Sequence, residues 1–238
     1  MSDIPDKSVD MCLTDPPYGT TACKWDTVIP FEPMWEQLKR IVKDNGAICL
    51  FGSEPFSSAL RMSNINMFKY DWQWNKTVSS QFMNAKLKPM NRHENISVFS
   101  KGKTANNNKN NMVYFPQGLK YNPKIVKTRK DSSRHLNHKW DRPSHKDKVL
   151  REYTNYPYAD IEFKPDRGSH PTQKPVALLE YLIKTYTLEN ETVLDFTMGS
   201  GSTGVAAKNL NRNFIGIEKD DKYFQIAKDR IEAVRHGH

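Results

Sequence analysis

A glycine-rich loop near the carboxyl end of the chain sets the strongest limit on its fold. Gly199, Gly201 and Gly204 follow an apolar stretch that ends at Asp195, and Glu218 ends the next apolar stretch. This order is typical of a dinucleotide-type fold, in which glycines let a ligand approach the backbone at a helix start and the acidic residue binds ribose hydroxyls. Gly204 is followed by only 34 of the 238 residues. Most strands of the sheet must therefore come from the amino-terminal half.

The acidic residues around this loop favour one ligand over another. A carboxylate at Asp195 would repel a pyrophosphate but could pair with a ligand that carries an amino group. S-adenosylmethionine has a ribose, an adenine and a cationic amino acid end without a phosphate, so it fits Asp195 and Glu218 better than NAD does. The alternative is that the glycines serve only the tight packing of a helix on a strand.

The pattern of apolar residues predicts an α/β fold. Strands are expected at 9–14, 47–51, 70–74, 96–99, 192–196 and 213–217, with a turn at Gly46. Helices are expected at 31–42, 56–62, 175–186, 202–210 and from residue 222 onward. Because strands and helices alternate, the sheet should be largely parallel.

The formal net charge of +9 lies entirely in one internal segment. Residues 101–169 carry 11 Lys and 5 Arg against 5 Asp and 2 Glu, whereas the rest of the chain holds 20 basic and 20 acidic residues. Aromatic residues lie among these charges. Basic groups neutralise phosphates and aromatic rings stack on unpaired bases, so the segment favours a nucleic acid partner over a merely solvated loop. The candidate DNA contacts are Lys124, Lys127, Arg129, Lys130 and Arg134.

Several classes of protein are excluded by composition. No stretch approaches 18 apolar residues, so no membrane span is expected, and the first residues lack the pattern of a secretory signal. Cys12, Cys23 and Cys49 have no CxxC spacing, which argues against a disulfide framework and a zinc site. We expect no metal and a reducing, cytoplasmic setting.

The tetrapeptide Asp15-Pro16-Pro17-Tyr18 follows the first expected strand. Its prolines fix the backbone at the carboxyl end of a strand, where open α/β sheets bind ligands. The Asp15 carboxylate and the Pro16 carbonyl are two acceptors, and Tyr18 offers a flat face. Together they suit an exocyclic aromatic amine stacked on a ring. A purely structural Pro-Pro turn would leave Asp15 and Tyr18 unexplained.

The order of these motifs resembles the β-group of S-adenosylmethionine-dependent DNA amino-methyltransferases. Residues 15–18 match the DPPY catalytic motif, and 170–175 (His-Pro-Thr-Gln-Lys-Pro) match the segment before the cofactor loop. Residues 195–204 match the FxGxG cofactor motif, and 215–218 match the acidic strand that follows it. The resemblance covers about residues 8–100 and 168–235.

The resemblance implies a circularly permuted Rossmann-like fold. Its sheet would be twisted, mostly parallel and seven-stranded, with a late antiparallel strand and helices on both faces. Residues 1–100 would form the catalytic half of one domain, 170–238 its cofactor-binding half, and 101–169 a basic, partly flexible target-recognition region. Relatives usually carry a further strand and short helix before the DPPY strand, so the pocket edge near the adenine is expected to be built differently here.

The resemblance also assigns roles to individual residues. Catalysis would fall to Asp15, Pro16, Pro17 and Tyr18. Cofactor contacts would come from His170, Thr172, Lys174, Asp195, Phe196, Thr197, Gly199, Ser200, Gly201, Ser202, Thr203 and Glu218.

The implied function is transfer of a methyl group to N6 of a flipped adenine in double-stranded DNA. N4-cytosine methylation is the nearest alternative, but cytosine enzymes of the family more often carry Ser in place of the leading Asp. C5-cytosine methylation needs a Pro-Cys pair, which the chain lacks. A non-catalytic DNA-binding relic and an NAD oxidoreductase are more distant alternatives. A homodimer and a companion restriction endonuclease are left open as further partners.

Overall fold

The computed structural model describes residues 1–20, 26–79, 82–106, 108–127, 148–166 and 173–234. The chain divides into two compact units. Unit 1 comprises Met1–Phe115 and Ala159–His238, and unit 2 comprises Pro116–Tyr158. Both ends of the chain therefore contribute to unit 1, as the late glycine loop requires.

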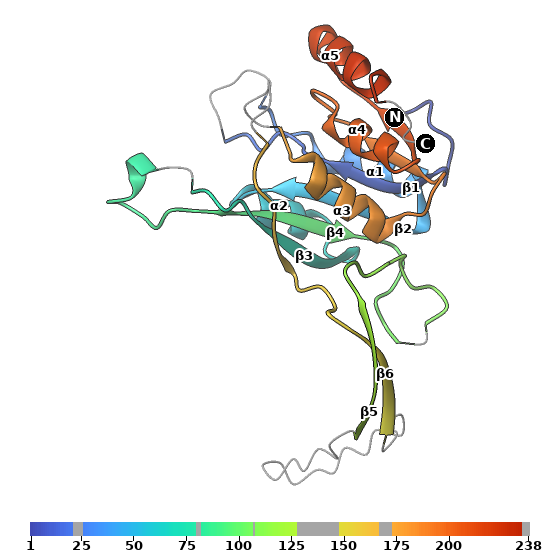
Figure 1. Cartoon of the computed structure of the whole chain (residues 1–238). Coiled ribbons are helices and arrows are strands. Elements are labelled where there is room, and N and C mark those ends of the chain that lie inside the picture. Colours follow the sequence, from blue (N-terminus) through green and yellow to red (C-terminus); the bar gives the residue numbers. More distant parts are fainter. Residues whose placement is uncertain (21–25, 80–81, 107, 128–147, 167–172, 235–238) are drawn as a thin grey trace. The chain divides into compact units, whose positions relative to one another are not determined.

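A seven-stranded sheet forms the centre of unit 1 (Figure 1). β4 is antiparallel to both of its neighbours, and the other pairs of adjacent strands are parallel. The expected α/β class with a mostly parallel seven-stranded sheet is confirmed. In spatial order the strands are β7 (Asp160–Glu162), β3 (Phe68–Asn75), β4 (His93–Phe99), β2 (Val42–Gly52), β1 (Val9–Thr14), β8 (Thr192–Asp195) and β9 (Asn213–Gly216).

Helices pack on both faces of this sheet. Successive side chains of a strand point to opposite faces, so Leu13 joins one buried cluster and Cys12 the other. The first cluster contains residues of α3 and α4, and the second contains residues of α1 and α2. The helices are α1 (Phe31–Ile41), α2 (Phe56–Ser63), α3 (Val176–Tyr186), α4 (Ser202–Asn209) and α5 (Asp221–Glu232).

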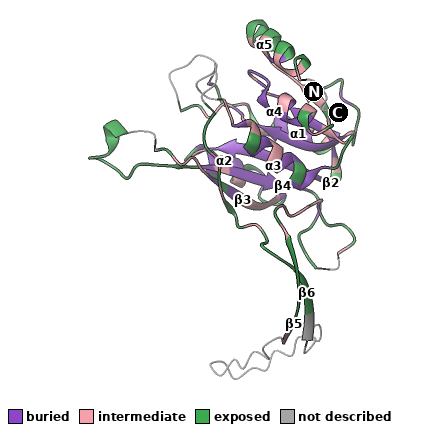
Figure 2. Ribbon diagram, in the orientation of Figure 1, coloured by how far each residue is buried: buried purple, intermediate pink, exposed green. Residues whose placement is uncertain are grey.

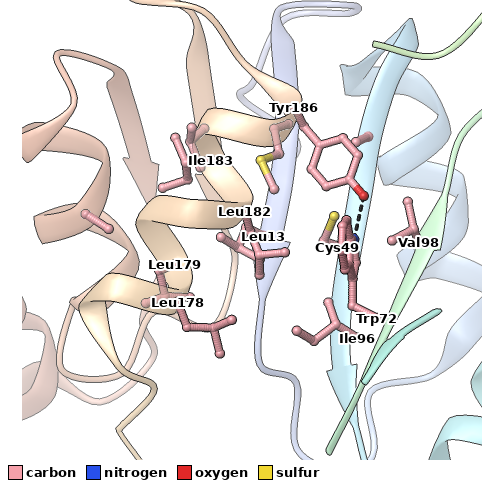
Figure 3. Packing of buried hydrophobic residues seen from close by; sticks show 14 of the residues in the cluster. Leu13, Cys49, Trp72, Ile96, Val98, Leu178, Leu179, Leu182, Ile183 and Tyr186 are labelled. Carbon is pink, nitrogen blue, oxygen red and sulfur yellow. Dashed lines mark hydrogen bonds between the residues drawn. The ribbon is translucent and has the colours of Figure 1, made fainter. Parts of the chain in front are cut away.

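Polar atoms inside the first cluster are hydrogen-bonded to one another. Figure 3 shows Tyr186 of α3 facing Trp72 of β3, whose indole nitrogen donates to the Tyr186 hydroxyl at 2.7 Å. The Tyr70 hydroxyl lies 2.9 Å from the same oxygen. Because a buried donor without a partner is costly, these contacts fix the position of α3 on the sheet. The segment leading into α3 carries Lys174.

The predicted turn at Gly46 is wrong, because β2 begins directly after α1 at Val42. The register with β1 jumps from the pair Val9–Val42 to the pair Met11–Ala47. The extra residues bulge out of the ladder, and a Cβ at Gly46 would lie 2.6 Å from the carbonyl oxygen of Asp10. This glycine is therefore required by a close backbone approach inside the strand.

The internal unit is shorter than the 101–169 region expected from its charge. Met112 is buried in the first cluster, and the Phe115 amide donates to the Thr185 carbonyl at 2.8 Å. After the insert, β7 adds the seventh strand to the sheet beside β3. These flanks pack with unit 1 because they carry apolar residues and strand pairings, which their net charge does not reveal.

Unit 2 contains a two-stranded antiparallel ribbon that the sequence pattern did not predict. It consists of β5 (Lys120–Lys127) and β6 (Lys148–Thr154). Lys124 lies directly opposite Arg151, and Tyr121 lies opposite Tyr153. Among the described residues, no helix is long and apolar enough to cross a membrane.

Candidate active site

The parallel pairing of β1 with β8 brings the two ends of the chain together. Met11 pairs with Val193 and Cys12 with Leu194, so the loops that follow both strands leave the same edge of the sheet. The Thr14 hydroxyl donates to Asp195 Oδ1 at 2.6 Å. The tetrapeptide after β1 and the glycine loop after β8 therefore form one site at the carboxyl edge of the sheet.

Asp15 belongs to a partly buried cluster of charged and polar groups. Lys174 Nζ lies 2.7 Å from Asp15 Oδ2 and 2.6 Å from Glu94 Oε1. The Tyr18 hydroxyl donates to Asp15 Oδ1 and, at 2.9 Å, to Glu94 Oε1. We call Asp15, Tyr18, Glu94 and Lys174 the carboxylate–lysine cluster. It joins the loop after β1, the start of β4 and the segment before α3.

Glu94 supplies the negative charge that holds Lys174 in place. Its side chain is only 6% exposed, and it also pairs with Lys76 at 2.5 Å. Burial raises the pKa of Glu94, but the ion pairs with Lys174 and Lys76 outweigh burial and bring it to about 2. Glu94 is therefore ionised across the physiological range.

The pKa values of Asp15 and Lys174 respond to the same charges. Burial raises the pKa of Asp15, and so does the negative charge of Glu94, whereas Lys174 opposes both effects. Burial disfavours the charged form of Lys174, but Asp15 and Glu94 overcome this and raise its pKa. Lys174 is therefore the cation that favours the ionised form of Asp15.

Aromatic rings enclose this cluster. The Tyr18 ring stacks on Phe56 with centroids 5.1 Å apart. Lys174 Nζ lies 5.0 Å from the centroid of Phe51. Burial, followed by the charges of Asp15 and Glu94, raises the pKa of Tyr18, so its hydroxyl stays protonated and acts as a donor.

Asp195 lies buried at the start of the glycine loop. Its Oδ1 accepts hydrogen bonds from the Thr14 hydroxyl at 2.6 Å and from the Thr197 amide at 3.1 Å. Burial raises the pKa of Asp195 to about 6, although the hydrogen bonds from Thr14 and Thr203 oppose that shift. A cationic group beside Asp195 would lower this pKa and favour the ionised form of Asp195.

The three glycines of the loop differ in what a side chain at their position would meet. A Cβ at Gly201 would lie 2.8 Å from the Ala227 side chain of α5, and one at Gly204 would lie 2.3 Å from Ile231 of the same helix. Both positions need glycine for packing. Gly199 has a φ of +49°, and a Cβ there would meet no other atom within 4 Å. Among the three, Gly199 is the one that faces open space.

Side-chain hydrogen bonds hold the backbone of this loop. Glu218 Oε2 accepts from the Gly199 amide at 2.8 Å, which ties the loop to the end of β9. Arg230 of α5 donates to the Ser200 carbonyl at 2.5 Å and to its hydroxyl at 2.9 Å. Sequence reasoning identified Glu218 but missed Arg230, because the helix that carries it has no motif.

The predicted site residues fall into four groups. The four residues 15–18 and those at 195–204 and 218 meet at one edge of the sheet, although Phe196 packs in the second buried cluster. Lys174, which we expected to contact the cofactor, forms ion pairs with Asp15 and Glu94. Lys124 and Lys127 lie on β5 in unit 2. Outside the described residues lie His170, Thr172, Arg129, Lys130 and Arg134.

Glu94 and Lys76 were missed by sequence reasoning. The available signal was a charged residue within two positions of an expected strand, and that pattern is common at strand ends. Their importance depends on the antiparallel placement of β4, which starts at the edge where β1 ends.

Comparisons with known proteins show the family of this chain. A family model described as DNA methylase, of the N6/N4 methyltransferases, matches residues 9–229. The Type II methyltransferase M.HpaI of Haemophilus parainfluenzae is 27% identical over 248 residues, which cover 100% of this chain and 72% of the relative. M.HinfI of Haemophilus influenzae is 28% identical over 98% of this chain and 65% of its own length.

Solved structures show the same fold. The complex of M1.HpyAVI with SAM has a TM-score of 0.58 and 29% identity, and the match covers 94% of this chain and 89% of that one. The PvuII DNA methyltransferase, which is cytosine-N4-specific, has a TM-score of 0.61 at 15% identity, with 96% and 81% covered. The chain belongs to the N6/N4 family of DNA methylases.

The depressed pKa of Glu94 predicts a specific pH dependence of stability. Because its pKa falls from 4.5 to about 2 on folding, Glu94 stabilises the fold above pH 4.5, and this contribution is lost as the pH falls toward 2. Glu94→Gln should lower the free energy of unfolding at pH 7 by on the order of 3 kcal/mol. It should also flatten the acidic part of the curve of unfolding free energy against pH, which urea unfolding at a series of pH values measures.

Glu54→Gln is the matched control, because the Glu54 carboxylate is 50% exposed where it pairs with Arg61. Its loss should cost less than about 1 kcal/mol. If the free energy of unfolding of Glu94→Gln fell as steeply with falling pH as that of the wild type, the role given to Glu94 would be contradicted.

Proposed function

We propose that this chain transfers a methyl group from S-adenosylmethionine to the exocyclic N6 of adenine in double-stranded DNA. The observation that carries the proposal is the hydrogen-bonded junction of Asp15 and Asp195. The Thr197 hydroxyl of the glycine loop donates to the Asp15 carbonyl at 3.1 Å. In the other direction, the hydroxyl of Thr14, the residue before Asp15, donates to the Asp195 carboxylate. A group bound at the glycine loop would therefore lie next to the Asp15 carboxylate.

The residues of the glycine loop fit the proposed cofactor. The buried Asp195, with its pKa raised to about 6, suits a cationic amino group. Gly199 faces open space at the loop, and Glu218, two residues after β9, accepts from its amide, so a ribose hydroxyl would find an acceptor there. When bound, S-adenosylmethionine supplies a methyl group that its sulfonium already activates for displacement.

Asp15 and the Pro16 carbonyl would accept the two hydrogens of the target amine. These hydrogen bonds would draw the nitrogen lone pair out of conjugation with the ring and direct it at the methyl group. Each Asp15 oxygen already accepts one hydrogen bond, and a carboxylate has about four acceptor positions, so room for the amine remains. The base must leave the duplex stack to reach Asp15, and the ring of Tyr18 would stack on it.

Lys174 and Glu94 would act as positioning residues for Asp15. A protonated Asp15 would lose acceptor capacity toward the amine, and burial pushes it in that direction. Lys174 opposes this shift at 2.7 Å, and Glu94 keeps Lys174 charged and oriented. The cluster would thereby favour the ionised form of the Asp15 carboxylate, whose side chain is only 30% exposed.

Replacement of Asp15 tests the proposed chemistry. Asp15→Ala should lower methyl transfer by about a hundredfold or more, because it removes a preorganised acceptor of the target amine. Binding of S-adenosylmethionine should stay within about threefold of the wild type, since Asp195 and Glu218 remain. Transfer of tritiated methyl groups to unmethylated genomic DNA measures the first quantity, and calorimetry measures the second.

Asp44→Ala is the control, because this 61% exposed carboxylate lies at the start of β2, at the opposite edge of the sheet. Near-normal turnover in Asp15→Ala would overturn the assignment. Mass spectrometry of the modified bases decides the target atom, and N4-methylcytosine as the product would replace adenine in the proposal. Single-molecule sequencing of the same DNA gives the recognised site.

Unit 2 is the proposed DNA-binding region, and its basic residues should govern salt dependence. Neutralising four of them should weaken DNA binding and reduce the slope of log affinity against log salt by up to about 4. Affinity for S-adenosylmethionine should barely change. The four substitutions, all to Gln, are at Lys124, Lys127, Arg129 and Lys130.

The control is a variant with four lysines of unit 1 changed to Gln, and it should keep the wild-type salt slope. Its substitutions are at Lys39, Lys208, Lys222 and Lys228. Equal losses of DNA and S-adenosylmethionine affinity in the unit 2 variant would show that the segment is structural. Homodimerisation stays a prediction, which sedimentation of the pure protein tests.

A further inference from the structure

The loop between β3 and β4, residues 76–92, combines positive charge with exposed apolar side chains. It contains three lysines and one arginine and no acidic residue. Phe82 is 80% exposed, Met83 94% and Leu87 85%. We call this segment the β3–β4 loop. Its positive charge is not apparent from the composition, because acidic residues elsewhere in the chain outside 101–169 balance it.

The described tip of the loop has a defined backbone. Phe82–Asn84 form the 3₁₀-helix η1, and the Ala85 amide donates to the Phe82 carbonyl at 3.0 Å. The Lys88 amide donates to the Asn84 carbonyl, also at 3.0 Å. Figures 1 and 2 show η1 beyond the ends of β3 and β4, with exposed residues throughout its turn. The apolar side chains are therefore presented on a compact turn.

The root of the loop is joined to the carboxylate–lysine cluster. The Lys76 amide donates to the Arg92 carbonyl at 2.9 Å, and the Lys76 side chain pairs with Glu94. β3 and β1 run in the same direction, because β4 is antiparallel to both β3 and β2, and β2 is parallel to β1. The loop therefore leaves the same edge of the sheet as Asp15.

We infer that the described tip of the β3–β4 loop, residues 82–87, is a wedge that enters the DNA duplex beside the target base and holds that base out of the stack. This inference rests on the proposed function. Apolar side chains such as Phe, Leu and Met are the groups that proteins insert between base steps. Lys86, Lys88 and Arg92 would contact the flanking phosphates. Because all charged residues of the loop are basic, DNA is favoured over a protein surface as its binding partner.

Removing the wedge should impair only those substrates whose target base is paired. The probes are synthetic duplexes that carry the site mapped by sequencing, with the target base paired or opposite an abasic position. The variant Phe82→Ala/Met83→Ala should methylate the paired duplex about tenfold more slowly than the wild type, because unstacking costs a few kcal/mol. The abasic duplex, whose target base is already unpaired, should restore the rate to within about threefold of wild type.

Met62→Ala/Ile65→Ala is the matched control, because these side chains are also exposed in unit 1, at 70% and 52%. It should behave as the wild type on both duplexes. A Phe82/Met83 variant that matches the wild type on the paired duplex, or that loses the same factor on both duplexes, would overturn the wedge. So would a wild-type dimer that this variant turns into a monomer in sedimentation, since a second copy would then cover the loop. A wild type inactive on both duplexes would instead refute the proposed function.

Discussion

The buried ammonium group of Lys174 is the interaction on which the site depends. It lies between two carboxylates that come from different parts of the chain, at 2.7 Å from Asp15 and 2.6 Å from Glu94. Without a cation, two carboxylates that share one ammonium group would disfavour each other's ionised form. Lys174 therefore favours the ionised form of Asp15, and it also joins the segment before α3 to the loop after β1 and to the start of β4.

Strand pairing makes this arrangement possible. β1 and β8 are far apart in the sequence but adjacent and parallel in the sheet, so Asp15 and Asp195 lie at one edge. The antiparallel β4 starts at that edge and brings Glu94 to it. A fold with its cofactor loop late in the chain thus builds the same kind of edge site that other open α/β sheets build early.

Much of this fold could be predicted from the sequence, because strands buried on both faces have continuous apolar runs and amphipathic helices have a clear period. The strand at Val9–Thr14 has the predicted bounds, and α4 begins at the predicted Ser202. Gly46 was misread because a glycine required by a bulge resembles one in a turn. The ribbon in unit 2 escaped prediction because its polar and basic residues show no clear alternation.

The site was only partly predictable for a different reason. Motif residues such as Asp15 and Glu218 carry their signal in the sequence around them. Glu94, Lys76 and Arg230 act through contacts between distant segments, and no local pattern marks them. Lys174 was noticed within a motif, but its partners became visible only in three dimensions.

The pH profile of methyl transfer in Lys174→Met tests the central claim most directly. Loss of the cation should raise the pKa of Asp15 further, so the acidic limb of the plot of kcat against pH should move to higher pH. Lys174→Arg, which keeps the charge, should stay close to the wild-type profile, and affinity for S-adenosylmethionine should change little in either variant. An unshifted acidic limb in Lys174→Met, together with lost cofactor affinity, would contradict the account and make Lys174 a cofactor contact.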